Sequence, residues 1–411
     1  MNVKLFSIKF CLTLIGLTPL IDTLNGYVAI YHNDSGNFFF QSIRLFLFAL
    51  ILFSLSRLDM KLFLQSIFVT VLLILITFVQ TAILLDLDYF SLSLSYAIKV
   101  SLYFSVFNFL GYLINKKYYQ MQVIKSIRTF SYLMPIVVII PNILGISRST
   151  YGSIGVGNAG LFIANNASGI ALIISTFILL LLSMSKTKLI RTDIIFLFFC
   201  FIALYQQSLR SGYMIIILGL LLILGKLFFA SKKLTISKLT FLTFLLLVIF
   251  LCIAYIIQNQ NIILSFFSGF NQRQEFLSTT TNNSILGTLT SGRIDKLFYI
   301  LNIWPNFSYI LWIIGVGQGY LSSVIGQISE MDFFDMYFYF GIIGWYVSYF
   351  KTWQFISGND FRLWTKMAKF LFLLSIFYSL FGGHVYWEII SSTSLIMLCC
   401  IARYVIPEKA G

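Results

Sequence analysis

The chain has 411 residues, of which 59% are hydrophobic, 18% aromatic and only 10% charged, and its formal net charge is +14. Soluble domains carry about 25% charged residues, so this composition excludes a soluble globular protein and indicates a polytopic membrane protein. The long apolar runs lack the alternation typical of a transmembrane β-barrel. We therefore predict an all-α fold.

A spanning helix needs about 20 apolar residues, and the chain contains about twelve such segments. In chain order they are centred on residues 6–24, 38–56, 62–85, 92–113, 124–144, 160–183, 189–207, 209–229, 238–258, 333–351, 366–383 and 385–404. The first segment follows Lys4 and Lys9 as a signal peptide would. It lacks a small-residue cleavage site and contains Pro19, so we expect it to be retained as a helix.

The charge distribution predicts the orientation of the chain. Cytoplasmic loops of membrane proteins collect Lys and Arg. With the N-terminus inside, most of the 28 basic residues fall in cytoplasmic segments and most of the 14 acidic residues fall on the outer side. We therefore predict that both termini are cytoplasmic. The same distribution explains the positive net charge, so we predict no nucleic-acid partner.

The spans divide the chain into three parts. Residues 1–258 hold spans one to nine, residues 259–332 form a large outer loop with short helices, and residues 333–411 hold the last three spans and a short cytoplasmic tail. The outer loop gathers both acids and bases. They are Arg273, Glu275, Arg293, Asp295, Lys296, Glu330 and Asp332. A protein that only spans lipid has no use for such a segment, whereas chemistry on a lipid-attached substrate at the membrane surface requires one.

Two cations, Arg44 and Lys99, lie inside predicted spans near their outer ends. Both are about six or seven residues in from the outer end, so they sit roughly 10 Å below the outer surface. A charge at a helix centre costs about 2.5–3.5 kcal/mol on insertion scales, and such residues usually face a bundle interior or a wet cavity. Snorkelling to the headgroups is the alternative. Two cations at matched depth favour an anion site.

Other polar residues fall at the same level. Asn165 and Asn166 lie near the outer start of the sixth span, and Arg210 lies in a tight outer turn between the seventh and eighth. Arg210 either belongs to this polar layer or is an ordinary interfacial arginine. His384 lies beside Glu388 at the outer junction of the last two spans, where it either orients a substrate or makes a structural hydrogen bond.

Within the outer loop, Arg293 is predicted to start an amphipathic helix, residues 309–314 are apolar but too short to span, and residues 315–319 form a flexible glycine-rich turn. Glu330 and Asp332 are expected just before the helix at 333–351. Asp335 at that helix N-terminus is explained by the helix dipole.

The cysteines indicate neither a disulfide nor a metal site, because all of them lie in apolar segments. They are Cys11, Cys200, Cys252, Cys399 and Cys400. The outer acid pair Asp86 and Asp88 has no further ligand nearby in sequence, so we predict no metal there either. Nothing in the sequence indicates a cofactor.

Several short segments, in this order and on this topology, resemble the O-antigen polymerase (Wzy-type) and O-antigen ligase superfamily. They are Pro19 to Gly26 followed by Arg44, Gly160 to Asn166, Ser208 to Ser211, Thr290 to Arg293, Gly315 to Gly319, Glu330 to Asp335, Gly341 to Gly344 and Gly382 to Val385. The resemblance implies a glycosyltransferase of a bacterial cytoplasmic (inner) membrane. Its donor and acceptor would be polyprenyl-pyrophosphate-linked oligosaccharides, with a chain-length regulator and a flippase as partners.

The chemistry of such a transfer assigns roles to the polar residues. Arginine suits a leaving pyrophosphate because its planar fork pairs with phosphate oxygens, so Arg210 and Arg293 are the first choices. The predicted substrate-binding residues are Arg44, Lys99, Asn165, Asn166, Arg273 and His384. Glu330 or Asp332 is expected to deprotonate the attacking hydroxyl, as in an inverting enzyme. The alternative is that these acids anchor the loop by pairing with Arg293 or Arg273.

Three other functions remain open. A transporter or flippase usually has internal repeats and a site near the bilayer midplane, and we see no repeat. Ligases of the superfamily often carry a histidine where this chain has Glu330 and Asp332, which favours a polymerase over a ligase. Nothing specific indicates a non-catalytic assembly subunit.

Overall fold

The structure is a computed structural model of the full chain. It describes residues 3–31, 37–85, 87–151, 156–184, 191–208, 212, 215–220, 275, 287, 290, 292–326, 328–357, 363–381, 383, 385–386 and 388–403. The predicted site residues Arg210, Arg273 and His384, together with most of spans 209–229 and 238–258, lie outside these residues.

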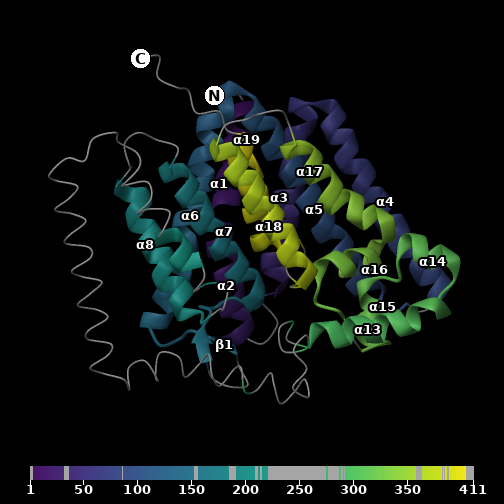
Figure 1. The fold of residues 1–411 in the computed structure, drawn as a ribbon. Coiled ribbons are helices and arrows are strands. Elements are labelled where there is room, and N and C mark those ends of the chain that lie inside the picture. Colours follow the sequence, from purple (N-terminus) through teal and green to yellow (C-terminus); the bar gives the residue numbers. More distant parts are fainter. Residues whose placement is uncertain are drawn as a thin grey trace.

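The described chain is helical apart from one small hairpin (Figure 1). Its helices are α1 (Val3–Gly16), α2 (Thr18–Tyr31), α3 (Asn37–Leu58), α4 (Met60–Leu84), α5 (Phe90–Asn115), α6 (Lys117–Ile143), α7 (Asn165–Met184), α8 (Arg191–Gln206), α13 (Arg293–Ile303), η1 (Trp304–Asn306), α14 (Tyr309–Ile314), α15 (Gln318–Ser323), α16 (Asp332–Trp345), η2 (Tyr346–Phe350), α17 (Lys351–Ile356), α18 (Leu363–Phe381) and α19 (Ile389–Arg403). Strands β1 (Ser149–Tyr151) and β2 (Val156–Asn158) pair antiparallel.

The coarse prediction of a helical membrane protein is confirmed. Among the described residues, α4, α5, α6 and α7 are long and apolar enough to cross a membrane, and the bent pair α1 and α2 makes a fifth. Helices α8, α18 and α19 are apolar but shorter. The predicted number of spans and the full extent of the outer loop remain predictions, because parts of both lie outside the described chain.

The helices form a bundle with a central and a peripheral layer. In α4 only 28% of the most apolar 18-residue stretch is buried inside the protein, whereas the corresponding share is 83% in α5 and 94% in α7. Helix α19 is buried from Ile389 to Ala402 and packs against α5, α7 and α18. Its run of small hydroxyl residues, Ser391 to Ser394, permits this close packing, since small side chains let helix backbones approach.

The first span differs from its prediction. A single helix was expected at 6–24, but α1 and α2 meet at a bend of 55° and the second helix continues to Tyr31. Pro19 lies in the first turn of α2, where its missing N–H removes no hydrogen bond from α2 itself. It does prevent α1 and α2 from forming one continuous helix. Gly26 then packs against the backbone of Leu161, where an added Cβ would lie 1.6 Å from the carbonyl oxygen. The bend therefore brings α2 against the segment that precedes α7.

The tenth predicted span also bends. Helix α16 begins at Asp332, one residue earlier than predicted, and has a non-helical residue at Gly341 with φ 60° and ψ −146°. A Cβ on Gly341 would lie 1.7 Å from the carbonyl oxygen of Ile313 in α14. The glycine thus allows the short outer helix to lie directly on α16.

The predicted flexible turn at residues 315–319 is instead a packed element. Gly317 and Gly319 fit against Ser93 of α5, and the backbone N–H of Gly319 donates to the Ser93 hydroxyl at 2.9 Å. Gln80 of α4 donates to the carbonyl oxygens of Ile314 and Tyr339, each at 2.8 Å. The glycines are there for close approach, and the segment is held in place by the bundle.

The two ends of the bundle differ in character. Helices α13, α14 and α15 and strand β1 lie at one end, and α17 lies at the other (Figure 1). The first end holds residues that the sequence assigns to the outer side, and we call it the outer end. The other end holds Lys116, Lys351 and Arg403, and we call it the basic end. The grouping agrees with the predicted topology, although sidedness itself remains a prediction.

The packing of Gly341 gives a test of the fold. We expect Gly341→Ala to lower the thermal unfolding midpoint of the detergent-solubilised protein strongly, because both its left-handed φ and the Ile313 carbonyl oppose a Cβ. The control is Gly145→Ala, which has a similar φ of +70° but nothing within 4 Å of the added atom. It should cost only about 1–2 kcal/mol. Equal losses in both variants would contradict the close packing of α14 on α16.

Candidate functional site

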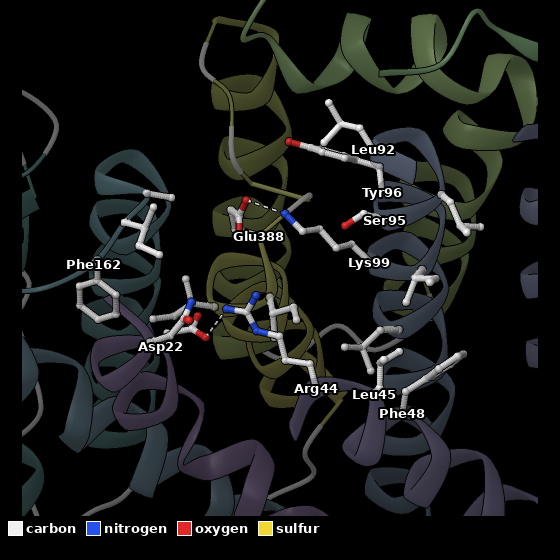
Figure 2. Close-up of a pocket in the computed structure, with 18 of the residues that line it drawn as sticks. Asp22, Arg44, Leu45, Phe48, Leu92, Ser95, Tyr96, Lys99, Phe162 and Glu388 are labelled. Atoms are coloured by element: carbon white, nitrogen blue, oxygen red, sulfur yellow. Dashed lines mark hydrogen bonds and ion pairs between the residues drawn. The ribbon is translucent and has the colours of Figure 1, made fainter. Parts of the chain in front are cut away.

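A cavity of about 500 Å³ opens among α2, α3, α5, the segment before α7 and the start of α19 (Figure 2). Apolar side chains such as Phe48 and Phe162 form much of its wall. Its main polar side chains are Asp22, Asn25, Arg44, Tyr96, Lys99 and Glu388. A volume of this size, with an apolar wall and a few convergent polar groups, is typical of ligand sites.

Both predicted intramembrane cations face this cavity, and each is paired with a carboxylate. Arg44 Nη2 lies 2.7 Å from Asp22 Oδ1, and Lys99 Nζ lies 3.1 Å from Glu388 Oε1. Figure 2 shows the two pairs directed into the same space, one beyond the other. The side chains are 10–21% exposed. Pairing offsets part of the cost of a charge in an apolar bundle, and both cations face the cavity, so snorkelling is not needed to explain either of them.

Tyr96 connects the cavity with the outer helices. Lys99 Nζ lies 4.7 Å from the centre of the Tyr96 ring, a cation–π distance. On its other side the Tyr96 ring packs edge-on against Tyr339 of α16, with ring centres 5.7 Å apart. The wall of the cavity is therefore continuous with the helix that follows the outer loop.

A second cluster of charges surrounds Glu330. Its carboxylate lies 2.6 Å from Lys296 Nζ and 3.5 Å from Arg293 Nε. Arg293 is the first residue of α13, as predicted, and follows Gly292 in a left-handed conformation. Glu330 itself has φ +55°, an uncommon and strained value for a residue with a side chain. The expected alternative role, in which Glu330 pairs with Arg293, is present in the structure.

Asp332 is in a different environment from Glu330. It is fully buried, and its Oδ2 accepts from the backbone N–H groups of Val385 at 2.5 Å and Tyr386 at 2.8 Å. Gly383 packs against the Glu330 carbonyl oxygen, where a Cβ would lie only 2.6 Å away. The carboxylate of Asp332 therefore holds the segment that leads into α19 and, two residues later, presents Glu388 to the cavity.

Asp335 has a local role at the start of α16. Its Oδ1 accepts from the backbone N–H of Ser329 at 3.1 Å and from the Ser329 hydroxyl at 2.7 Å. These bonds fix the turn that carries Glu330. The predicted dipole contribution at the helix N-terminus is compatible with them, but the side chain makes specific contacts as well.

The remaining predicted residues are distributed unevenly. Asn165 begins α7 and donates to the carbonyl oxygen of Ser149 in β1 at 3.3 Å, so it ties the hairpin to the bundle. Asn166 is half-buried, and neither asparagine lines the cavity, although their neighbour Ala164 does. The structure thus brings together Arg44 with Lys99, and Arg293 with Glu330. For Arg210, Arg273 and His384 no contact is described.

The sequence did not predict that Asp22 and Glu388 pair with the two cations of the cavity. Asp22 was noted only as part of a motif and Glu388 only as a neighbour of His384. A charge rule would have identified both: an acid at the same depth as a buried cation, on another span, is its natural partner. What the sequence does not reveal is which acid pairs with which base, because that depends on the bend at Pro19 and on the turn before α19.

Comparison with known proteins adds no assignment. No protein-family model, curated protein or solved structure matches the chain. The resemblance to the polymerase and ligase superfamily therefore rests on the motifs in the sequence alone.

The ion pairs can be tested by a double-mutant cycle on Asp22 and Arg44. We expect Asp22→Asn and Arg44→Gln each to destabilise the protein and the double variant to recover part of the loss, with a coupling energy of about 0.5–3 kcal/mol. Thermal unfolding in detergent is the measurement. The same cycle on Lys125 and Asp22, which do not pair, serves as control. Additive effects within about 0.3 kcal/mol for Asp22 and Arg44 would show that the pair does not form.

Proposed function

We propose that the protein is a polysaccharide polymerase of the O-antigen or capsule type. In this proposal it joins polyprenyl-pyrophosphate-linked oligosaccharide repeats at the outer face of a bacterial cytoplasmic membrane by inverting glycosyl transfer. The observation that carries the proposal is the cavity in which Arg44 and Lys99 face the same space near the outer end of an apolar bundle.

The cavity suits one particular kind of ligand. Its apolar wall would contact the first part of a lipid chain, and its two cations would donate hydrogen bonds to the oxygens of a diphosphate. Both cations are already paired with carboxylates. An incoming diphosphate would therefore replace Asp22 and Glu388 as their partners, and would not enter a site with unpaired cations. Charge-assisted bonds from a guanidinium to phosphate oxygens are among the stronger hydrogen bonds in proteins.

The transfer itself needs a bond exchange at one sugar carbon. The hydroxyl oxygen of the acceptor sugar bonds to the anomeric carbon of the donor while the bond from that carbon to the diphosphate breaks. The polyprenyl diphosphate leaves with the electron pair, and its charge is stabilised by cationic side chains. We assign this stabilisation to Arg293 with Arg44 and Lys99, and retain Arg210 from the sequence.

We assign the base to Glu330 in preference to Asp332. A base must reach the hydroxyl proton that it removes. The Glu330 side chain is 29% exposed beside Arg293 and Lys296, whereas Asp332 is buried and binds two backbone N–H groups. In this scheme Glu330 takes the proton and Asp332 is a positioning residue for the Glu388 segment.

Two alternatives use the same observations. A ligase of the same superfamily would bind the same donor and differ in the acceptor, and the missing histidine before α16 favours the polymerase. A flippase would move the lipid-linked unit without breaking it. The one-sided position of the polar groups, near the outer end, favours an enzyme over a flippase.

The first test of this function uses the arginines. We expect Arg293→Ala or Arg210→Ala to abolish polymer while single lipid-linked repeats still reach the outer face. Loss of one donor to a developing negative charge lowers the rate by roughly 10²–10³-fold. The measurement is the ladder of products formed by purified protein from lipid-linked repeats, together with the sidedness of repeats in cells. Arg148→Ala, an exposed arginine on the predicted outer side, is the control.

The outcomes separate the alternatives. Full-length polymer in both arginine variants would end the diphosphate assignment. Repeats that accumulate on the inner face would instead identify a flippase. Transfer of finished polymer to a lipid acceptor, without any ladder, would identify a ligase.

A second test distinguishes the base from the positioning residue. We expect Glu330→Gln to lower the turnover rate by roughly 10²–10⁴-fold with little change in thermal stability. Asp332→Asn should lower the unfolding midpoint, because it weakens two hydrogen bonds to a charged acceptor, each worth about 1.5–3 kcal/mol. Unfolding curves and the pH profile of the ladder assay are compared for both variants. A stable Asp332→Asn protein with no activity at any pH would reverse the two assignments.

A further inference from the structure

A second cavity, also of about 500 Å³, lies at the basic end of the bundle, where α4 begins, α5 ends and α17 follows η2. Its polar side chains are Asp59, Asn108, Asn115, Lys116, Lys351 and Gln354. It is distant in the fold from the outer-end cavity and shares no lining residue with it. The proposed function makes no use of it.

The walls of this second cavity are built by specific contacts. Gly111 of α5 lets Phe355 of α17 approach closely, since an added Cβ would lie 3.2 Å from the ring. Asn108 is buried and donates to the Ser66 hydroxyl at 3.0 Å, which joins α5 to α4. Arg403 of α19 donates to the Phe355 carbonyl oxygen and covers its ring from 5.0 Å. Helices α4, α5 and α17 therefore form the walls of this cavity, and α19 supports α17 through Arg403.

The charge of the second cavity is unbalanced. Lys116 and Lys351 line it, and neither forms an ion pair with a described residue, in contrast to Arg44 and Lys99. The carboxylate in the wall, Asp59, already caps α4 by accepting from the backbone N–H groups of Lys61 at 3.0 Å and Leu62 at 3.3 Å. Two cations against one capping carboxylate leave a net positive site with amide donors around it.

The surroundings indicate what kind of anion reaches this site. Helix α4 turns most of its surface outward, and its exposed residues include Leu64, Phe68 and Leu75, which are 54–66% exposed. In a membrane this face is covered by acyl chains. The cavity lies at the end of that face, at the level of the lysine-rich turns that mark the headgroup region. A ligand that joins the two features has a phosphate head and apolar tails.

We propose that this cavity binds the phosphodiester headgroup of an anionic phospholipid, with Lys116 and Lys351 on the phosphate and the acyl chains along α4. Basic pockets between transmembrane helices at the cytoplasmic side are suited to such headgroups. The bound lipid would hold the ends of α4, α5 and α17 together, where α4 has little protein around it. This role is independent of any chemistry at the outer end.

The test uses the full-length protein in a neutral detergent. Its thermal unfolding midpoint is followed while phosphatidylglycerol, phosphatidylcholine, a polyprenyl phosphate or inorganic phosphate is added. We expect phosphatidylglycerol alone to raise the midpoint in a saturable manner, since a ligand that binds only the folded state stabilises it. In Lys116→Gln/Lys351→Gln the apparent Kd should rise at least tenfold. The control Lys117→Gln/Lys125→Gln removes two exposed lysines of the same end that do not line the cavity and should behave as wild type.

Four results would overturn the proposal. Equal stabilisation by phosphatidylcholine would show that only acyl chains bind, and stabilisation by inorganic phosphate alone would show a site for a free anion. A stronger response to polyprenyl phosphate would assign the site to the lipid carrier. An unchanged Kd in the glutamine pair would remove the lysines from the site. If the glutamine pair aggregates, Lys116→Arg/Lys351→Arg is compared with Lys351→Gln alone, and lipid retention by native mass spectrometry must follow the number of cations.

Discussion

The structure depends on the compensation of charge inside an apolar bundle. Arg44 and Lys99 lie within helices, where an isolated cation would be strongly disfavoured, and each is held by a carboxylate from another segment of the chain. Asp22 comes from α2 and Glu388 from the turn before α19, so one pair joins α2 to α3 and the other joins α5 to the C-terminal part of the chain. A pair of this kind stabilises only if its geometry is good and its remaining hydrogen-bonding groups are satisfied. The charge balance of the cavity therefore depends on the bend near Pro19, which positions Asp22, and on the turn fixed by Asp332, which positions Glu388.

Paired cations also define what such a cavity can bind. A site lined by bare cations would be hard to keep in an apolar bundle without an anion, whereas internal carboxylates keep the empty site neutral and in shape. A diphosphate offers more oxygens and more charge than the carboxylate it displaces, so the exchange can be favourable while the free-energy cost of the empty site stays small. The same exchange would release Glu388 at the moment when ligand binds, which makes the state of the turn before α19 sensitive to occupancy.

The sequence predicts those features of the fold and the site that depend on residues close together in the chain, and misses those that depend on tertiary contacts. Hydropathy located α3, α4, α5 and α8 within about two residues at each end because a span is a property of one segment, whereas α6 begins seven residues before its predicted segment and α7 five residues after it. The start of α13 at Arg293 was predicted from its local sequence. The bend between α1 and α2 and the bend at Gly341 were both missed. Gly341 acts through its contact with Ile313 of α14, which is 28 positions away in the chain and outside the stretch that a hydropathy window samples. For the same reason residues 315–319 were mistaken for a flexible turn. Arg44 and Lys99 were identified from the cost of burying charge, but their partners were not, because pairing is decided by the tertiary arrangement.

The position of Asp332 connects the two charged clusters at the outer end through the backbone. Its carboxylate binds the backbone at Val385 and Tyr386, and Gly383 packs on the carbonyl of Glu330. The backbone of Glu330 and the backbone of Gly383 are therefore in direct contact, and Glu330 also holds Lys296 and Arg293 through its carboxylate. The turn that contains Gly383 ends at Glu388, the partner of Lys99 in the cavity. Backbone contacts of this kind fix the relative position of two segments more firmly than contacts between flexible side chains do, because closely packed backbones have little room to move. A substrate that reaches both clusters, as the proposed transfer requires, would therefore meet the Glu330 carboxylate and the Lys99–Glu388 pair along one connected segment of the chain.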